Sequence, residues 1–135
     1  GLSLGKAQRF RFHCLNDNLP TLTAYANDLS YDDVYVEPLK NFLEAGDLVI
    51  AISGSGNSRN VLKAIEYANG AGAITLGITG YDGGKLRKIA QRGLHVPIND
   101  MQVVEDLHMV FDHLAYAVLG AVLPLEGGAG ASGHG

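Results

Sequence analysis

The feature that most restricts the fold is a pair of apolar runs, residues 47–53 (DLVIAIS) and 73–79 (AITLGIT), separated by one amphipathic segment. Continuous apolar runs of this length are typical of parallel strands whose two faces are both covered. Between them, apolar residues recur at helical spacing over residues 61–68, after Ser58 as N-cap and before a stop at Gly70. Strand, helix and strand in this order predict a right-handed crossover between neighbouring parallel strands.

The remaining segments continue this alternation of strands and helices. Because proline is tolerated only in the first turn of a helix, Pro38 places a helix mainly after Glu37. The other expected elements are a half-buried strand over residues 9–15, a basic helix over 85–92, a short strand over 94–98 and a long helix over 101–119, whereas residues 22–28 are ambiguous. The predicted fold class is α/β, a three-layer αβα sandwich with a parallel sheet, flavodoxin-like in arrangement. Ligands of such sheets bind beyond the carboxyl ends of the strands.

Length and composition fit a single domain. The chain has 135 residues, of which 47% are hydrophobic, and this is enough for one core and too little for two. We place the domain at residues 1–125. Residues 126–135 are rich in glycine and small side chains, and we interpret them as a flexible, linker-like tail.

Charge and hydropathy exclude two classes of partner. Ten basic and 14 acidic residues, without a cluster of Lys or Arg, argue against direct binding of nucleic acid. No apolar stretch approaches the roughly 20 residues that span a bilayer, so we expect no membrane partner. The single cysteine, Cys14, cannot form an internal disulfide and is expected to be a small buried hydrophobe. These features predict a soluble, cytoplasmic protein.

A glycine-serine loop, SGSGNS at residues 53–58, joins the first apolar run to the helix that follows. A dinucleotide-binding GxGxxG motif would need glycine where Arg59 stands, and the Gly-Lys-Ser/Thr ending of a nucleotide-triphosphate loop is absent. Three serine hydroxyls beside a helix N-terminus could bind a phosphomonoester without a lysine. A serine-rich turn that only caps the helix is an equally good interpretation of the spacing.

Five segments together resemble the SIS (sugar isomerase) family, and within it the phosphoheptose isomerase branch. They are AISGSGNSRNVLKAIEYA around the loop, then YANDLSYDDVY, EAGDLVIAIS, TGYDGGKL and VEDLHMVFDH, in matching order and spacing over most of residues 7–122. The resemblance implies that the loop binds the phosphate of a phosphosugar. By position it assigns phosphate binding to Ser53, Gly54, Ser55, Asn57 and Ser58, with Gly54 standing where relatives often have threonine.

The resemblance also assigns residues to the sugar and to the chemistry. Asp28 matches an aspartate that contacts sugar hydroxyls, although an aspartate of an Asx turn or helix cap is the simpler interpretation of its local sequence. An aldose-ketose isomerase needs a base near C1 and C2 and an acid for the oxygens. His113 falls on a histidine proposed as acid and metal ligand, and Glu105 falls where relatives have glutamine. Both are candidate catalytic residues and candidate ligands of a metal, for which the resemblance implies zinc.

The other histidines carry weaker signals. For His108, a partly exposed helix histidine or a core histidine with a satisfied hydrogen bond is about as common an outcome as a catalytic one. His13 and His95 lie in strand patterns and are expected to be structural.

The resemblance further implies a preceding helix, a strand and a GNGGSA-type loop, followed by a helix that carries a histidine and a glutamate. No GNGGS string occurs in this chain. We therefore expect an N-terminally incomplete SIS domain that does not turn over substrate alone, and a homo-oligomer, because an unpaired sheet edge invites association. The favoured function is isomerisation of sedoheptulose 7-phosphate through an enediol. The alternative is a non-catalytic SIS module that senses phosphosugars or mediates interactions.

Overall fold

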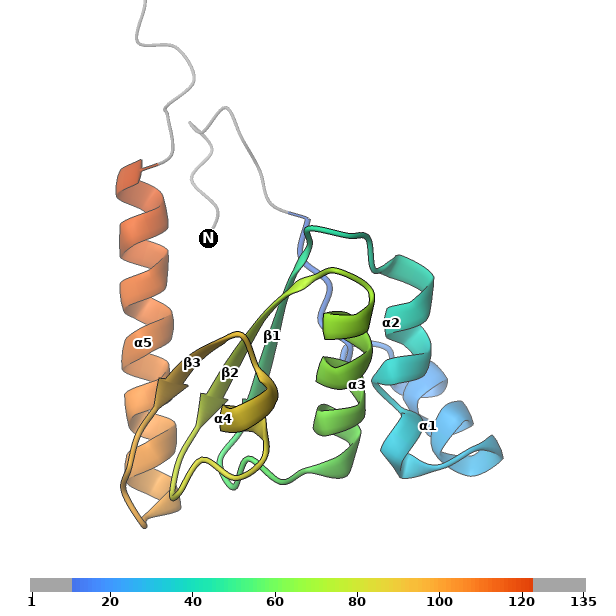
Figure 1. The fold of residues 1–135 in the computed structure, drawn as a ribbon, viewed down its shortest axis with the longest axis horizontal. Helices are drawn as coiled ribbons and strands as arrows, with labels where there is room; N and C mark the ends of the chain where they lie inside the picture. Colours follow the sequence, from blue (N-terminus) through green and yellow to red (C-terminus); the bar gives the residue numbers. More distant parts are fainter. Residues whose placement is uncertain (1–10, 123–135) are drawn as a thin grey trace, which may run out of the picture. The chain divides into compact units, whose positions relative to one another are not determined.

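The computed structural model describes residues 11–122 of the chain (Figure 1). Residues 14–108 form one compact unit, and the described residues 11–13 and 109–122 belong to a second one. The first unit contains the sheet and the serine loop. No helix within the described residues is long and apolar enough to cross a membrane.

A three-stranded parallel sheet organises the first unit. Its strands β1 (Leu48–Ser53), β2 (Ile74–Thr79) and β3 (Arg92–His95) lie in the order β1-β2-β3, with Ile50 opposite Leu76 in the first pair. Helix α3 (Arg59–Gly70) connects β1 to β2, and the short helix α4 (Leu86–Ile89) connects β2 to β3 (Figure 1). The α/β class and the parallel sheet are thus confirmed.

Three helical segments precede the sheet, and a long helix follows it. Helix α1 (Leu19–Asp28) begins where Asn18 Oδ1 accepts a hydrogen bond from Thr21 N at 3.1 Å, a side-chain N-cap. Helix α2 (Val36–Phe42) has Pro38 in its first turn, where a missing N–H costs nothing. The other two are the 3₁₀ turn η1 (Tyr31–Asp33) and helix α5 (Met101–Val122).

Helix α3 contributes buried residues to both hydrophobic clusters of the first unit. Ile65 and Ala68 are completely buried, and Leu62 packs with Ala51 of β1 and Leu86 of α4. Full burial of a side chain such as isoleucine stabilises a fold by about 1.5–3 kcal/mol. The apolar residues whose helical spacing was predicted from the sequence therefore form the face that packs α3 against the sheet.

The two faces of β1 differ, which corrects the expectation of a strand covered on both sides. Ala51 and Ser53 are buried, whereas Leu48, Ile50 and Ile52 are 57%, 45% and 62% exposed. Within the described part of the chain, β1 also has a strand neighbour on one edge only. An apolar run does not show whether both faces of the strand are covered, and this explains the error.

Two further sequence expectations were wrong. Residues 11–14 have no regular structure and Cys14 is exposed, because period-two alternation gives a strand only where a neighbouring strand is available to pair. The basic helix expected over residues 85–92 is reduced to α4, since Gln91 N donates to Thr75 Oγ1 at 3.0 Å and draws the chain onto β2. The expected glycine-rich tail, residues 126–135, lies outside the described residues.

The other boundaries agree with the sequence to within a few residues. The ambiguous residues 22–28 form the larger part of α1, and the strand expected at 94–98 is displaced to β3. The helix expected over 101–119 is α5, which extends to Val122.

Candidate functional site: the serine loop

The loop begins where β1 ends, at the carboxyl edge of the sheet. Ser53 is buried, and both its carbonyl oxygen and its Oγ accept a hydrogen bond from Gly56 N, at 3.0 and 3.1 Å. Gly56 has φ +65°, a conformation that favours glycine. The first serine is therefore fixed by the turn that it starts.

Ser58 occupies the N-cap position of α3, as the sequence predicted, but its hydroxyl does not cap the helix. It lies 3.1 Å from Ser53 Oγ instead, so the two hydroxyls form a pair at the start of the helix. In the described structure, the backbone N–H groups of Arg59 and Asn60 have no hydrogen-bond partner. Unpaired N–H groups of this kind carry the positive end of the helix dipole and favour an anion.

Ser55 and Asn57 complete the loop in different ways. Ser55 Oγ accepts from Asn57 N at 3.2 Å, which leaves the Ser55 hydroxyl proton able to donate to a ligand. The Asn57 side-chain amide makes two hydrogen bonds. Its Nδ2 donates to Ser55 O at 3.1 Å, and its Oδ1 accepts from Lys85 N at 3.1 Å. Asn57 thus braces the loop from within.

A second loop, residues 80–86, packs directly on the serine loop. Gly80 N donates to Gly54 O at 2.8 Å, and Leu86 N donates to Gly56 O at 2.9 Å. A Cβ on Gly56 would lie 2.0 Å from Gly83 O, far inside contact distance. In the sequence, TGYDGGKL was used only for the family resemblance, although its paired glycines were the available signal of this close approach.

Gly54 stands where the resemblance expected threonine, and the structure shows what occupies that space. A Cβ there would lie 2.7 Å from Met101 Sδ, at the start of α5. The methionine side chain thus fills the position that a larger loop residue would need.

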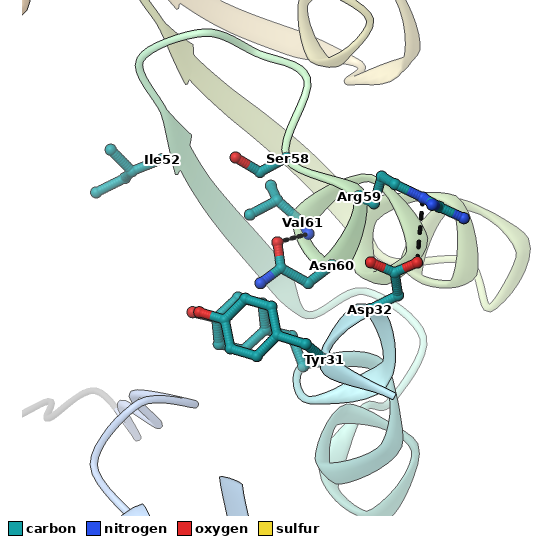
Figure 2. Close-up of a pocket in the computed structure, with 8 residues that line it drawn as sticks. Tyr31, Asp32, Ile52, Ser58, Arg59, Asn60 and Val61 are labelled. Carbon is teal, nitrogen blue, oxygen red and sulfur yellow. Dashed lines mark hydrogen bonds and ion pairs between the residues drawn. The ribbon is translucent and has the colours of Figure 1, made fainter. Parts of the chain in front are cut away.

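A cavity of about 420 Å³ opens beside this loop, between η1 and the first turn of α3 (Figure 2). It is lined by Tyr31, Asp32, Tyr35, Ile52 and residues 58–61. Of these, only Ser58 was singled out by the sequence as a site residue. The available signal for the others was that SYDD and NSRN both lie in segments that resemble one family.

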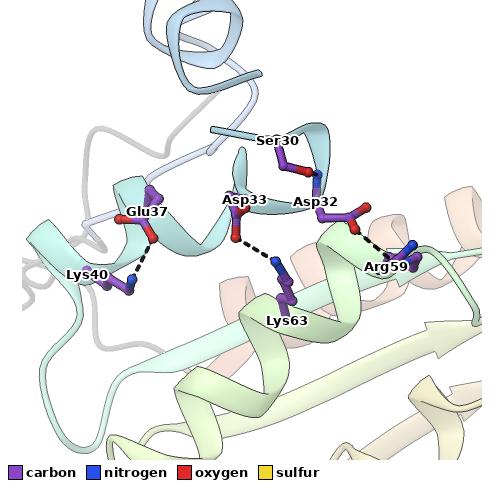
Figure 3. Close-up of polar contacts among 7 residues, drawn as sticks. All are labelled: Ser30, Asp32, Asp33, Glu37, Lys40, Arg59 and Lys63. Atoms are coloured by element: carbon purple, nitrogen blue, oxygen red, sulfur yellow. Dashed lines mark hydrogen bonds and ion pairs between the residues drawn. The ribbon is translucent and has the colours of Figure 1, made fainter. Parts of the chain in front are cut away.

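Two ion pairs hold η1 against α3 at this cavity (Figure 3). Asp32 Oδ2 lies 3.1 Å from Arg59 Nε, and Asp33 Oδ1 lies 2.8 Å from Lys63 Nζ. Ser30 Oγ accepts from Asp32 N at 3.1 Å and so starts the turn. Both basic side chains nearest the serine loop on α3 are therefore already paired with carboxylates.

The remaining predicted site residues are exposed. Asp28 is the exposed last residue of α1 and does not line the cavity. Glu105 is exposed on the part of α5 that belongs to the first unit, and His113 is exposed in the second unit. Their roles in sugar contact and catalysis stay predictions.

Two histidines of the first unit, His95 and His108, each contact Thr79. His108 Nε2 lies 3.3 Å from Thr79 O, and His95 Nδ1 lies 3.0 Å from the buried Thr79 Oγ1. Both rings therefore have a hydrogen-bond partner within the protein, as expected for His95, whereas the two alternatives for His108 stay open.

The residues present do not make a zinc site on their own. Catalytic zinc is held by three protein ligands. Over residues 11–122, no group of three His, Cys, Asp or Glu side chains could hold a metal ion. Within the described residues the implied zinc therefore has no three-ligand site.

The sequence of this chain is similar to that of known proteins. Residues 11–80, just over half of the chain, match the family model described as SIS domain. The chain is 40% identical over 99 residues to a phosphoheptose isomerase from Aliarcobacter butzleri, which covers 73% of this chain and 52% of that protein. It is 38% identical over 105 residues to a probable phosphoheptose isomerase from Thermoplasma volcanium, covering 78% and 54%.

A solved structure is similar as well. The phosphoheptose isomerase from Neisseria gonorrhoeae matches with a TM-score of 0.78 and 30% identity, over 80% of this chain and 60% of that one. The chain spans about half the length of the curated relatives it matches.

Proposed function

Since this chain belongs to the SIS domain family, we propose that its serine loop binds the phosphate group of a phosphosugar. The observation that carries the proposal is the arrangement at the start of α3. The hydroxyls of Ser53 and Ser58 lie side by side, 3.1 Å apart, at a helix start whose Arg59 and Asn60 N–H groups are unpaired within the described structure. A dianion offers acceptors to all of these donors, and hydrogen bonds to a charged group contribute about 1.5–3 kcal/mol each.

The pairing of the two basic residues of α3 nearest the loop fits a phosphate that is bound there largely by hydrogen bonds. Arg59 and Lys63, the basic residues nearest the loop on α3, are paired with Asp32 and Asp33. Specificity for a phosphomonoester then depends on the number and direction of O–H and N–H donors rather than on a salt bridge.

For the longer protein to which such a domain contributes, we propose isomerisation of a heptose 7-phosphate. The curated relatives are phosphoheptose isomerases, and their printed name indicates the substrate class. The reaction moves a proton between C1 and C2 through an enediol. A base removes the proton from one carbon while an acid protonates the carbonyl oxygen, and the proton then returns to the other carbon as the neighbouring hydroxyl loses its proton to become the new carbonyl. His113 is our candidate acid, Glu105 a second candidate catalytic residue, and Asp28 the candidate contact to sugar hydroxyls.

We propose that this chain alone binds phosphosugar without turning it over. Asp28, Glu105 and His113 are exposed, and within residues 14–108 neither Asp28 nor Glu105 lines the cavity beside the serine loop. Incubation with sedoheptulose 7-phosphate, followed by NMR of the sugar protons, is expected to show no product. Conversion to an aldose 7-phosphate at an enzymatic rate would refute this part of the proposal.

We also propose that the protein acts in the cytoplasm as a homo-oligomer. Support for association comes from the apolar face of β1, where Leu48, Ile50 and Ile52 are about half exposed, and from its unpaired edge within the described residues. Size-exclusion chromatography with light scattering is expected to give a dimer or larger assembly. A well-folded monomer at the same concentration would contradict it.

The phosphate site is tested by calorimetric titration with sedoheptulose 7-phosphate and with unphosphorylated sedoheptulose. Only the phosphorylated sugar should bind, and Ser55→Ala should weaken its binding about tenfold, the equivalent of one hydrogen bond of about 1.4 kcal/mol. Thr23→Ala, which removes a hydroxyl on the exposed side of α1, is the matched control and should leave affinity unchanged. Equal binding of the two sugars would show that the loop does not select phosphate.

A further inference from the structure

The peptide group between Thr79 and Gly80, at the carboxyl end of β2, makes hydrogen bonds on both of its sides. Its carbonyl oxygen accepts from Val96 N at 2.9 Å and lies 3.3 Å from His108 Nε2 on α5. Its N–H group, that of Gly80, donates to Gly54 O in the serine loop at 2.8 Å. Because a peptide group is planar and rigid, this one connects His108 with the serine loop.

Packing holds this peptide group between α5 and the serine loop. A Cβ on Gly80 would lie 2.6 Å from Cγ1 of the fully buried Val104 and 3.2 Å from Gly54 O. Thr79 is 1% exposed, and its Oγ1 lies 3.0 Å from His95 Nδ1. All of these residues belong to the first unit. The peptide group therefore has neighbours on both sides and little room to tilt.

His108 is the hydrogen-bond donor in its contact with Thr79. A carbonyl oxygen only accepts hydrogen bonds, so the proton of this bond is on His108 Nε2. This requirement selects the Nε2–H tautomer of the neutral ring. The half-buried ring thus polarises the carbonyl group to which it donates.

The series of hydrogen bonds continues into the serine loop and ends at an unpaired N–H group. Gly54 O and Ser55 N belong to one peptide group, and in a trans peptide the C=O and N–H groups point in opposite directions. Ser55 N–H therefore points away from Gly80, and it has no hydrogen-bond partner among the described residues. Peptide groups bonded in series polarise one another, which strengthens each bond by about 10–30%. Ser55 N is thus a stronger donor to an anion than an isolated amide.

We propose that His108 is a positioning residue of the phosphate site. Its Nε2–H group holds the peptide group of Thr79 and Gly80, and this group in turn holds the peptide group of Gly54 and Ser55 with its N–H directed at the bound phosphate. The inference rests on the proposed function and adds to it a residue that acts through two peptide groups. His108 then has a role that neither packing alone nor catalysis describes.

Two variants of similar size separate the donor of His108 from its ring. His108→Gln keeps an N–H donor at about the place of Nε2, and His108→Leu has none. Both variants lack the aromatic ring, and both new residues favour a helix. Each chain is titrated by NMR with inorganic phosphate and with sedoheptulose 7-phosphate.

His108→Leu should bind both ligands about threefold more weakly than the wild-type chain, because every later bond of the series is weakened. His108→Gln should restore most of this affinity. Leu107→Gln changes the neighbouring position of α5, which is 40% exposed, and as the control it should bind both ligands as the wild-type chain does.

The amide proton of Gly80 in the ligand-free chain gives a second readout, which a role in packing alone would not change. Amide protons shift upfield as their hydrogen bonds weaken, so this resonance should lie upfield in His108→Leu relative to His108→Gln. Ring currents do not enter the comparison, because neither variant has the ring. If His108→Leu fails to fold, ¹⁵N spectra of the wild-type ring at alkaline pH decide the result: protonated Nε2 supports the inference, and a neutral ring protonated at Nδ1 overturns it.

The outcomes separate this inference from the proposed function. If both variants bind the two ligands as tightly as the wild-type chain, His108 does not position the loop, and the phosphate site stands. If both variants lose affinity equally, the ring acts by its packing and not as a donor, and the inference is likewise overturned. If the wild-type chain binds neither ligand, the proposed function fails, and the inference fails with it.

Discussion

Substitution of Gly56 by alanine tests whether the serine loop is held in shape by the loop that packs on it. Gly56 has φ +65°, and its added Cβ would lie 2.0 Å from Gly83 O. The left-handed conformation costs a non-glycine residue about 1–2 kcal/mol. The overlap must also move the loops apart, which breaks the hydrogen bonds from Gly56 N to Ser53 and from Leu86 N to Gly56 O, at about 1 kcal/mol each. Gly56→Ala should therefore lose about 3–4 kcal/mol of unfolding free energy.

Gly46 gives a matched control, because it separates the backbone cost from the overlap. Its φ is +90°, and a Cβ there would meet nothing within 4 Å. Gly46→Ala should therefore lose only the conformational cost of about 1–2 kcal/mol. Urea unfolding followed by circular dichroism measures both variants, and equal destabilisation of the two would refute the packing of residues 80–86 on the serine loop.

Two further substitutions test contacts elsewhere in the fold. Asn69→Ala should lower the free energy of unfolding by about 1–3 kcal/mol, because Asn69 Oδ1 accepts a hydrogen bond from the fully buried Thr75 Oγ1 at 2.7 Å. Asn41 is exposed, so Asn41→Ala should change the free energy of unfolding by no more than about 0.5 kcal/mol in the same urea assay. Glu37→Gln should lower the pKa of Lys40, which its hydrogen bond to Glu37 holds above the usual value. The Lys40–Glu37 pair stabilises the fold below the ordinary lysine pKa, and this stabilisation is lost as the pH rises through the raised pKa of Lys40. NMR titration of Lys40 in the wild-type and Glu37→Gln proteins measures the change, and equal pKa values in the two proteins would contradict the prediction.

The central part of the fold could be predicted because its signals are local. The apolar runs that became β1 and β2 and the helical period of α3 each specify their own element, and Ser58 marks the helix start. The sequence also located the serine loop, because a loop between a strand and a helix in a parallel sheet lies at the ligand-binding edge.

The parts that could not be predicted depend on contacts between distant segments. The glycines of residues 80–86 are required by the serine loop, about 30 positions earlier in the sequence. The cavity lies between η1 and α3, which ion pairs such as Asp33–Lys63 connect, and neither residue alone predicts that contact. The exposure of alternate β1 residues shows that one face of this strand is left uncovered within the described structure, which an apolar run does not encode.

The central claim, that the start of α3 binds a phosphomonoester, is tested most directly by amide chemical-shift mapping during titration with sedoheptulose 7-phosphate. The account predicts saturable shifts concentrated at the amides of residues 53–60, with Arg59 and Asn60 among the largest because their N–H groups are unpaired within the described structure. Saturable shifts that spare these amides and gather elsewhere on the sheet would contradict it.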